Sequence, residues 1–279
     1  MSGYAEAILL MLAINVVVAQ AGYLPLAAGQ LNLGVAGFMA IGAYVSAFVT
    51  NTYDLPIVLG IVSGAFAAWL VAVLLAVPLL RASGIYLALA TFALGQVIQA
   101  VFLNLEVVGA AAGYAVKKHA SFSLIMTTTA TVLALVFLLS RTRFALYLTA
   151  VKNDPVVSDL FGINVRMIKV QAFSLGALIA GVGGALYAHQ YSYLEPQNFN
   201  ILLSVYIVLY VLLGGTQTVL GPILGAFFFT LLPELLRGSE QWRYVVFALF
   251  IIALMALRPQ GLITTELLRR LTLRRESKG

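Results

Sequence analysis

The sequence LPIVLGIVSGAFAAWLVAVLLAVPLL, residues 55–80, contains no Asp, Glu, Lys, Arg or His. About 20 such apolar residues suffice for one helical crossing of a bilayer, where an ionisable side chain costs about 2.5–3.5 kcal/mol. The 279-residue chain as a whole is 62% hydrophobic and 9% charged, with a mean hydropathy of +1.02. A soluble domain typically carries about 25% charged residues. The composition therefore predicts an all-α, polytopic membrane protein.

The other charge-free runs predict the remaining crossings. Two of them, 7–53 and 196–233, are too long for one helix and contain turn-forming glycine and proline residues. We therefore expect about nine membrane helices, of which the seventh and ninth are short enough to be partial or tilted crossings. Their expected ranges are 5–21, 33–50, 55–80, 82–105, 120–140, 170–188, 201–213, 219–236 and 244–257. The whole chain, 1–279, is interpreted as one transmembrane domain.

The basic residues indicate the orientation. Lys and Arg gather in the loop 141–169 and in the tail 259–279, and such residues favour cytoplasmic segments. An even number of predicted crossings separates the two segments, so both can be cytoplasmic, with the C-terminus inside and the N-terminus outside. The formal charge of +6 fits this pattern, and no nucleic-acid partner is expected. Residues 5–21 lack a basic leader and are expected to be a retained span rather than a cleaved signal peptide.

The predicted spans contain almost no ionisable groups. Proton-coupled transporters usually keep such groups in the membrane, so proton coupling through this chain is disfavoured, while sodium coupling through backbone carbonyls stays open. The sequence has no cysteine, no Walker-type phosphate loop, and no paired carboxylates or metal-ligand spacing within the spans. We expect a transporter subunit rather than an enzyme, with no cofactor and no metal.

Neutral polar residues in or beside the spans are candidates for lining a path for a small polar or zwitterionic solute. We assign this role to Asn32, Thr91, Gln96 and Gln99. Hydrogen bonding between helices is the alternative, and it is the more common role for any single residue of this kind.

The predicted span 170–188 carries small residues at helical spacing on two adjacent faces. Such faces are nearly bare backbone, which usually means close packing of helices and not a solute site. The residues are Gly176, Ala180 and Gly184 on one face and Ala177, Gly181 and Ala185 on the other.

The loop 141–169 contains a short segment with its own helix signals. Asp154 can cap a helix, Pro155 suits its first position, and Gly162 suits its C-terminal turn. We therefore expect a helix of about two turns. Its apolar face would carry Val156, Val157, Leu160 and Phe161, opposite Ser158 and Asp159. This face could lie on lipid headgroups or on the chain itself, or it could dock in a groove of a cytoplasmic partner.

Short elements along most of the chain carry a resemblance to a known family. They stand in order at 28–34 (AGQLNLG), 41–44 (IGAY), 84–91 (GIYLALAT), 162–165 (GINV), 180–189 (AGVGGALYAH), 213–215 (LGG), 220–222 (LGP), 233–237 (PELLR) and 258–262 (RPQGL). Together they resemble the membrane permease of ATP-binding-cassette (ABC) importers of the branched-chain amino acid (LIV) class, in particular the M-type subunit. The resemblance implies a multi-pass protein of the prokaryotic plasma (inner) membrane that forms half of a translocation pathway for branched-chain or other hydrophobic amino acids.

The resemblance also implies partners. These are a second homologous permease subunit, two ATP-binding subunits that hydrolyse ATP, an extracytoplasmic solute-binding protein, and membrane lipid. The segment 153–165 corresponds to the helix that couples such permeases to the ATPase. Its coupling residues would be Asp154, Pro155, Val156, Val157, Asp159, Leu160, Phe161 and Gly162.

Two loops on the opposite side, 104–120 and 191–200, would face the binding protein. Lys117, Lys118 and Glu195 are the charged residues that we expect to contact it, with solvated loop charges as the alternative. The two lysines are exceptions to the positive-inside pattern.

Departures from the family pattern concern the solute. The segment 107–114 replaces an expected stretch rich in glycine and serine or threonine, Val35 stands where His is frequent, and Gln260 stands where Arg is common. Related permeases carry urea, short amides or other amino acids, and these are alternative solutes. A stand-alone channel or a sodium-coupled carrier is a further alternative, which would transport without an ATPase.

Overall fold

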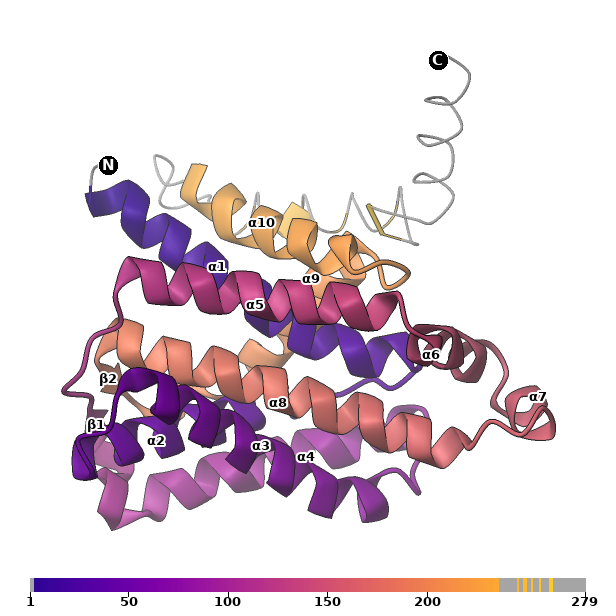
Figure 1. Ribbon diagram of the computed structural model, residues 1–279, viewed down its shortest axis with the longest axis horizontal. Coiled ribbons are helices and arrows are strands. Elements are labelled where there is room, and N and C mark those ends of the chain that lie inside the picture. Colours follow the sequence, from indigo (N-terminus) through magenta and orange to yellow (C-terminus); the bar gives the residue numbers. More distant parts are fainter. Residues whose placement is uncertain are drawn as a thin grey trace.

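The chain forms a bundle of long helices in the computed structural model, which describes residues 3–235 together with Val245, Ala248, Leu249, Ile252, Ala256, Gly261 and Leu262 (Figure 1). Within this part, seven helical stretches are long and apolar enough to cross a membrane. They are α1 (Gly3–Ala27), α2 (Val35–Thr52), α3 (Ile57–Leu79), α4 (Ile85–Asn104), α5 (Phe122–Ser140), α8 (Val165–Tyr191) and α9 (Ile201–Gly214), the last with its preceding turn η3 (Pro196–Asn198). The shorter elements are α6 (Arg143–Asn153), α7 (Pro155–Leu160), α10 (Leu220–Leu235), the turns η1 (Glu106–Val108) and η2 (Ala110–Ala112), and the strands β1 (Tyr114–Ala115) and β2 (Tyr193–Leu194).

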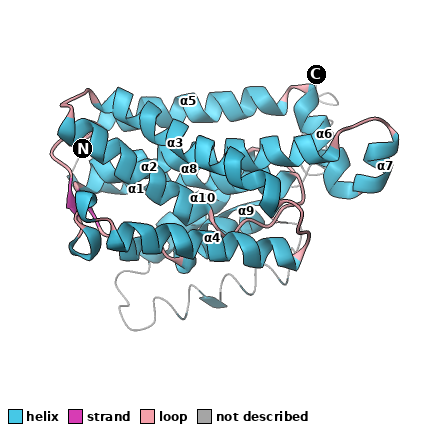
Figure 2. Cartoon of the chain, turned by 90° about the horizontal axis from the view of Figure 1, so that it is seen from below, coloured by secondary structure: helices cyan, strands magenta, loops and turns pink. Residues whose placement is uncertain are grey.

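The bundle has two distinct ends. The helices α6 and α7 lie at one end, termed the α7 end, and α7 projects beyond the long helices (Figures 1 and 2). The antiparallel pair of β1 and β2 lies at the opposite end, termed the β end. Because α5 runs between the two ends, the loops before and after it lie at opposite ends of the bundle.

The helices α1 to α5 and α8 to α10 correspond to the first eight predicted spans, and the main difference is the end of the first. The sequence predicts an end near residue 21, but α1 continues to Ala27. Pro25 disturbs only the last turn, and Gly22 packs against α9, where an added Cβ would lie 2.9 Å from Ile207 Cγ2. The prediction at 244–257 falls largely outside the described residues.

The helix α8 is the centre of the bundle and packs against α1, α2 and α3. The six small residues that predict close packing are all buried. A Cβ added at Gly181 would lie 2.8 Å from Ala68 Cβ on α3, and one at Gly184 would meet the carbonyl oxygen of Met39 on α2. The prediction of close helix packing is confirmed.

The helices α2 and α3 approach each other and α8 in the same way. A Cβ at Gly42 would meet the backbone of Gly181, and a Cβ at Gly64 would meet the carbonyl oxygen of Gly42. Three backbones therefore meet with almost no side chain between them. Lipid tails are as apolar as leucine, so contact at this range, rather than the hydrophobic effect, holds such helices together.

Replacing Gly42 by alanine is expected to destabilise the bundle by about 1–3 kcal/mol. The added methyl group would meet only backbone atoms of Gly181, so the two helices would have to separate. The measurement is the apparent melting temperature of the purified protein in a mild detergent. Gly3→Ala is the matched control, because a Cβ at Gly3 meets nothing within 4 Å. Equal melting temperatures for the two variants would contradict the close approach.

Candidate functional site

The predicted helix at the α7 end is present, and its N-terminus is capped. Asp154 Oδ1 accepts hydrogen bonds from the backbone N–H groups of Val156 and Val157, at 2.9 and 3.0 Å. Pro155 occupies the first turn, where a backbone N–H would have no acceptor within the helix, so proline loses no hydrogen bond there. These contacts satisfy backbone donors that a helix of this length cannot satisfy internally.

The C-terminus of α7 is closed by Gly162. Its backbone is left-handed, with a φ of 79°, a conformation that glycine adopts without the steric cost of a Cβ. The N–H groups of Gly162 and Ile163 donate to the carbonyl oxygens of Asp159 and Ser158, at 2.9 and 3.1 Å. This pair of bonds is the usual C-terminal helix stop, so α7 is a defined structural unit at both ends.

The apolar side chains of α7 point away from the bundle. The exposed fractions are 71% for Val156, 82% for Leu160 and 81% for Phe161, and Val157 is also exposed. Ser158 is buried on the other side, where its hydroxyl donates to the carbonyl oxygen of Asp154. An exposed apolar cluster on a projecting, capped helix is typical of a surface that docks a partner.

A groove lies beside α7, with a volume of about 820 Å³. It is bounded by α7, the first turns of α8 and the connection between α3 and α4. Three basic residues line it, Arg81, Arg166 and Lys169, with the single carboxylate of Asp159 among the described lining residues. The sequence places Arg81 on the same side of the membrane as α7, but only the fold brings it to the groove.

The segments before α2 and α9 are unwound inside the bundle. Leu33 N–H donates to Thr91 Oγ1 at 3.0 Å, about 9 Å along α4 from its first residue. Ala36 N–H, in the first turn of α2, donates to Ser204 Oγ in the first turn of α9, also at 3.0 Å. The N-termini of α2 and α9 therefore meet inside the bundle, beside the second turn of α4 and not at its end. In transporters, unwound backbone at such a depth is buried in protein or lines a cavity, and half-helix N-termini there often mark solute sites.

Three of the four candidate path residues form hydrogen bonds at these unwound segments, but the four do not form one cluster. Asn32 Oδ1 accepts from Gly34 N–H at 2.8 Å, beside Thr91 at the start of α2. Gln99 Nε2 donates to the carbonyl oxygen of Pro196 at 3.1 Å, before α9. Gln96 is half-buried on α4.

The two loops assigned to a binding protein come together at the β end. The strands pair Tyr114 with Leu194 and Ala115 with Tyr193, which joins the loop 104–120 to the loop 191–200. The sequence contains no signal for this pairing, since each strand is only two residues long.

The three charged candidates in these loops differ in their surroundings. Lys117 and Glu195 are exposed. Lys118 Nζ lies 2.6 Å from Asp54 Oδ1 and also donates to the carbonyl oxygen of Leu55, so it is tied to the connection between α2 and α3. The Lys118 ammonium holds the pKa of the Asp54 carboxyl below its usual value. Lys118 therefore stabilises the loop, and the exposed side chains of Lys117 and Glu195 are the two that could contact a partner.

His189 joins the β end to the core. Its Nδ1 lies 2.8 Å from the carbonyl oxygen of Lys118, and its Nε2 lies 3.0 Å from Ser46 Oγ. A carbonyl oxygen only accepts, so Nδ1 carries the proton, and Nε2 of the neutral ring accepts from the serine hydroxyl. Within the described part of the chain, no three His, Cys, Asp or Glu side chains gather as metal ligands. Nothing in the sequence around His189 indicates these contacts.

Strained backbone also concentrates at the β end. Among the described residues, the non-glycine positions with a left-handed φ are Asp54 at 52°, Ala110 at 47° and Ser192 at 57°. All three lie in the loops around the β1–β2 pair. Such conformations cost about 1–3 kcal/mol each and tend to gather where a loop must keep one shape for recognition.

Comparison with known proteins gives one family. Residues 4–256 match the family described as "Branched-chain amino acid transport system / permease component". The high-affinity branched-chain amino acid transport system permease protein LivM of Escherichia coli (strain K12) is 28% identical, over 92% of the chain and 67% of its own length. The fructose import permease protein FrcC of Rhizobium meliloti is 28% identical, over 43% of the chain and 36% of its own length. No solved structure matches the chain.

A labelling experiment tests whether the two ends face opposite sides of a membrane. The natural sequence has no cysteine, so Lys117→Cys and Phe161→Cys each introduce a single thiol. A membrane-impermeant maleimide is expected to label Lys117→Cys in right-side-out vesicles and Phe161→Cys in inverted vesicles, because α5 lies between the two positions. The vesicles come from cells that express the chain without partner subunits. Both positions are exposed in the chain alone, so access limits neither reaction. Labelling of both from one side would contradict the arrangement.

Proposed function

Because the chain belongs to the family of branched-chain amino acid transport system permease components, we propose that it forms half of the membrane pathway of an ATP-driven importer for branched-chain or other hydrophobic amino acids. The protein is a multi-pass membrane protein, and the part of the chain that the structure describes has seven helical stretches able to span a bilayer. In this proposal it has no catalytic site of its own, and ATP is hydrolysed by two partner subunits. A second, homologous permease supplies the other half of the pathway.

The observation that carries the proposal is the exposed apolar face of α7. Leu160 and Phe161 are more than four-fifths exposed on a helix whose ends are both capped. Such a helix can enter a groove of an ATP-binding subunit and keep its shape when that subunit moves. The basic groove around Arg81 and Arg166 adds charge to the same surface. Motion of the partner would pass directly into α6 and α8, which flank α7 in the chain.

The orientation follows from the same assignment. In this proposal α7, the loop 141–169 and the C-terminal tail 259–279 lie in the cytoplasm, and the β end and the N-terminus lie outside. A solute-binding protein would then dock at the β end. The exposed charges of Lys117 and Glu195 and the shaped loops around β1 and β2 support that contact.

We place the solute path beside the unwound segments before α2 and α9. Asn32 and Thr91 shape the first of them, Gln99 holds the second, and Gln96 lies between them on α4. Neutral amide and hydroxyl groups among apolar side chains suit a zwitterion with a hydrocarbon side chain. The relatives named for branched-chain amino acids, which match over 92% of the chain, favour such a solute over urea, short amides or other amino acids.

Leu160→Asp is expected to abolish ATP-driven uptake and to remove the ATP-binding subunit from the purified complex. The carboxylate would be buried without a partner on docking, which costs several kcal/mol. The measurement combines mild-detergent purification from the native membrane, identification of bound subunits, an ATPase assay, and uptake of labelled leucine into proteoliposomes with competing solutes. Leu160→Met is the matched control, since it keeps the apolar volume, and it is expected to retain the complex and uptake.

The outcomes separate the proposal from its alternatives. A wild-type chain that purifies alone and still moves solute in liposomes would favour a stand-alone channel or a sodium-coupled carrier. Normal uptake by Leu160→Asp would reject α7 as the coupling helix. If urea or a short amide inhibits the uptake of labelled leucine and isoleucine does not, the assigned solute is wrong. The ATP-driven mechanism would still stand.

A further inference from the structure

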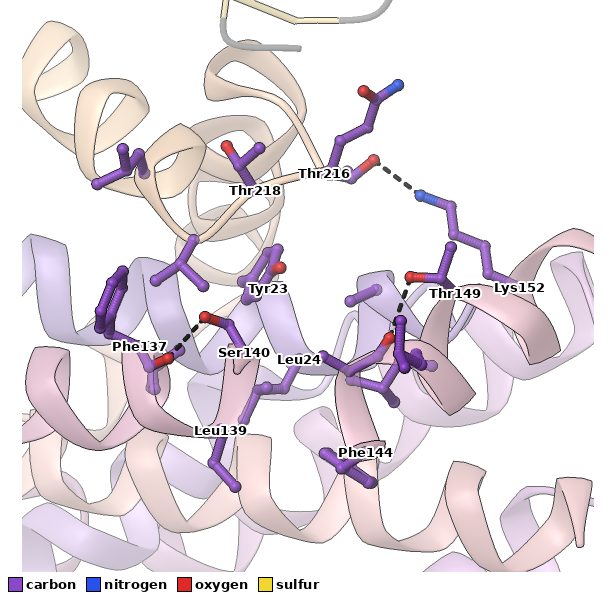
Figure 3. A pocket seen from close by; sticks show the side chains of 18 of the residues that line it. Tyr23, Leu24, Phe137, Leu139, Ser140, Phe144, Thr149, Lys152, Thr216 and Thr218 are labelled. Carbon is purple, nitrogen blue, oxygen red and sulfur yellow. Dashed lines mark hydrogen bonds between the residues drawn. The ribbon is translucent and has the colours of Figure 1, made fainter. Parts of the chain in front are cut away.

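A second cavity lies at the α7 end, apart from the groove at α7. It has a volume of about 770 Å³ and lies between the end of α5, the helix α6 and the connection between α9 and α10 (Figure 3). The last turns of α1, with Tyr23 and Leu24, line it as well. The function proposed above makes no use of this cavity.

The walls of the cavity continue the apolar outer surface of the bundle. Phe137 on α5 and Leu220 on α10 line it, and they are 48% and 45% exposed. Leu139 and Leu212 lie in the same walls. The exposed apolar face of α5, a helix long and apolar enough to cross a membrane, therefore borders the cavity on one side.

The opposite part of the cavity is polar. Lys152 Nζ donates to Thr216 Oγ1 at 2.8 Å, which joins α6 to the α9–α10 connection across the opening (Figure 3). Thr149 and Asn153 on α6 line the cavity as well, so polar side chains stand on the same helix as the Lys152 ammonium.

The charged groups at this cavity are positive. Among the described lining residues, Lys152 is the only charged one. The guanidinium of Arg141 lies 4.9 Å from the ring centre of Phe137, so a second cation stands beside the wall. Partial burial lowers the pKa of the Lys152 ammonium, and an anion beside it would oppose that shift.

We propose that the cavity binds one anionic phospholipid from the leaflet at the α7 end. The phosphate lies against Lys152 and Thr216, and an acyl chain lies along Phe137 and Leu220. The combination of one cation, a hydroxyl group beside it and an apolar wall matches the two parts of such a lipid. A free inorganic phosphate would leave the apolar wall empty.

The bound lipid would join two parts of the chain that no helix connects directly. Lys152 belongs to α6, which leads into α7, and Thr216 belongs to the connection between α9 and α10. A lipid phosphate held by both would restrain the movement of α6 relative to α9. Anionic lipid is therefore expected to stabilise the purified protein as well as to bind it.

The test is native mass spectrometry of the full chain, purified in detergent with the subunits that accompany it, during titration with phosphatidylglycerol and, separately, phosphatidylcholine. The wild type is expected to retain one phosphatidylglycerol in preference to phosphatidylcholine. Lys152→Gln is expected to weaken phosphatidylglycerol binding about fivefold, and Thr216→Val, which removes the hydroxyl beside Lys152 at nearly constant shape, is expected to weaken it as well. Lys169→Gln is the matched control, because Lys169 lines the groove at α7 and not this cavity.

Three results would overturn the proposal. The first is equal retention of the two lipids by the wild type, and the second is equal loss of phosphatidylglycerol in Lys152→Gln and Lys169→Gln. The third is displacement of the bound phosphatidylglycerol by millimolar inorganic phosphate, which would assign the site to a free anion. None of these results depends on transport, so failure here and failure of the importer proposal are distinguishable.

Discussion

The contact of α8 with α2 and α3 through bare backbone is the constraint on which the rest of the structure depends. At Gly42, Gly64, Gly181 and Gly184 the helices approach so closely that a single methyl group would meet backbone atoms. Packed in this way, the three helices cannot slide or rotate past one another without a clash. They form one rigid unit. The helices α1 and α4 pack against it, and the unwound segment after α1 leads into it at α2.

The parts of the fold that depend on local signals could be predicted from the sequence. Charge-free runs place the spans because a charge in hydrocarbon is costly wherever the helix lies in the bundle. The ends of α7 follow from Asp154, Pro155 and Gly162, whose effects act within one turn. The small residues from Gly176 to Ala185 predict close packing because they leave the helix surface flat. The end of α1 is different, since Gly22 serves a contact with α9 that no local pattern reveals.

The candidate sites could be predicted only in part, because they depend on contacts between residues far apart in the sequence. The polarity of Thr91 and Gln99 marks them as candidates, but their partners, Leu33 and Pro196, lie 58 and 97 residues away in the sequence. Arg81 reaches the groove at α7 through the fold alone. A pattern of hydrophobic residues indicates which face is buried, but it does not identify the residue on the other side of the contact.

The position of the glycine contact along α8 has a mechanical consequence. The helix has 27 residues, so it is about 40 Å long, and His189 ties its far end to Ser46 and Lys118. The contact at Gly181 and Gly184 lies about 26 Å from the α7 end and about 14 Å from the other end. Because α8 is locked to α2 and α3 at this contact, it cannot tilt alone. A force applied at α7 would therefore reach Ser46 and the β end through three helices that move together.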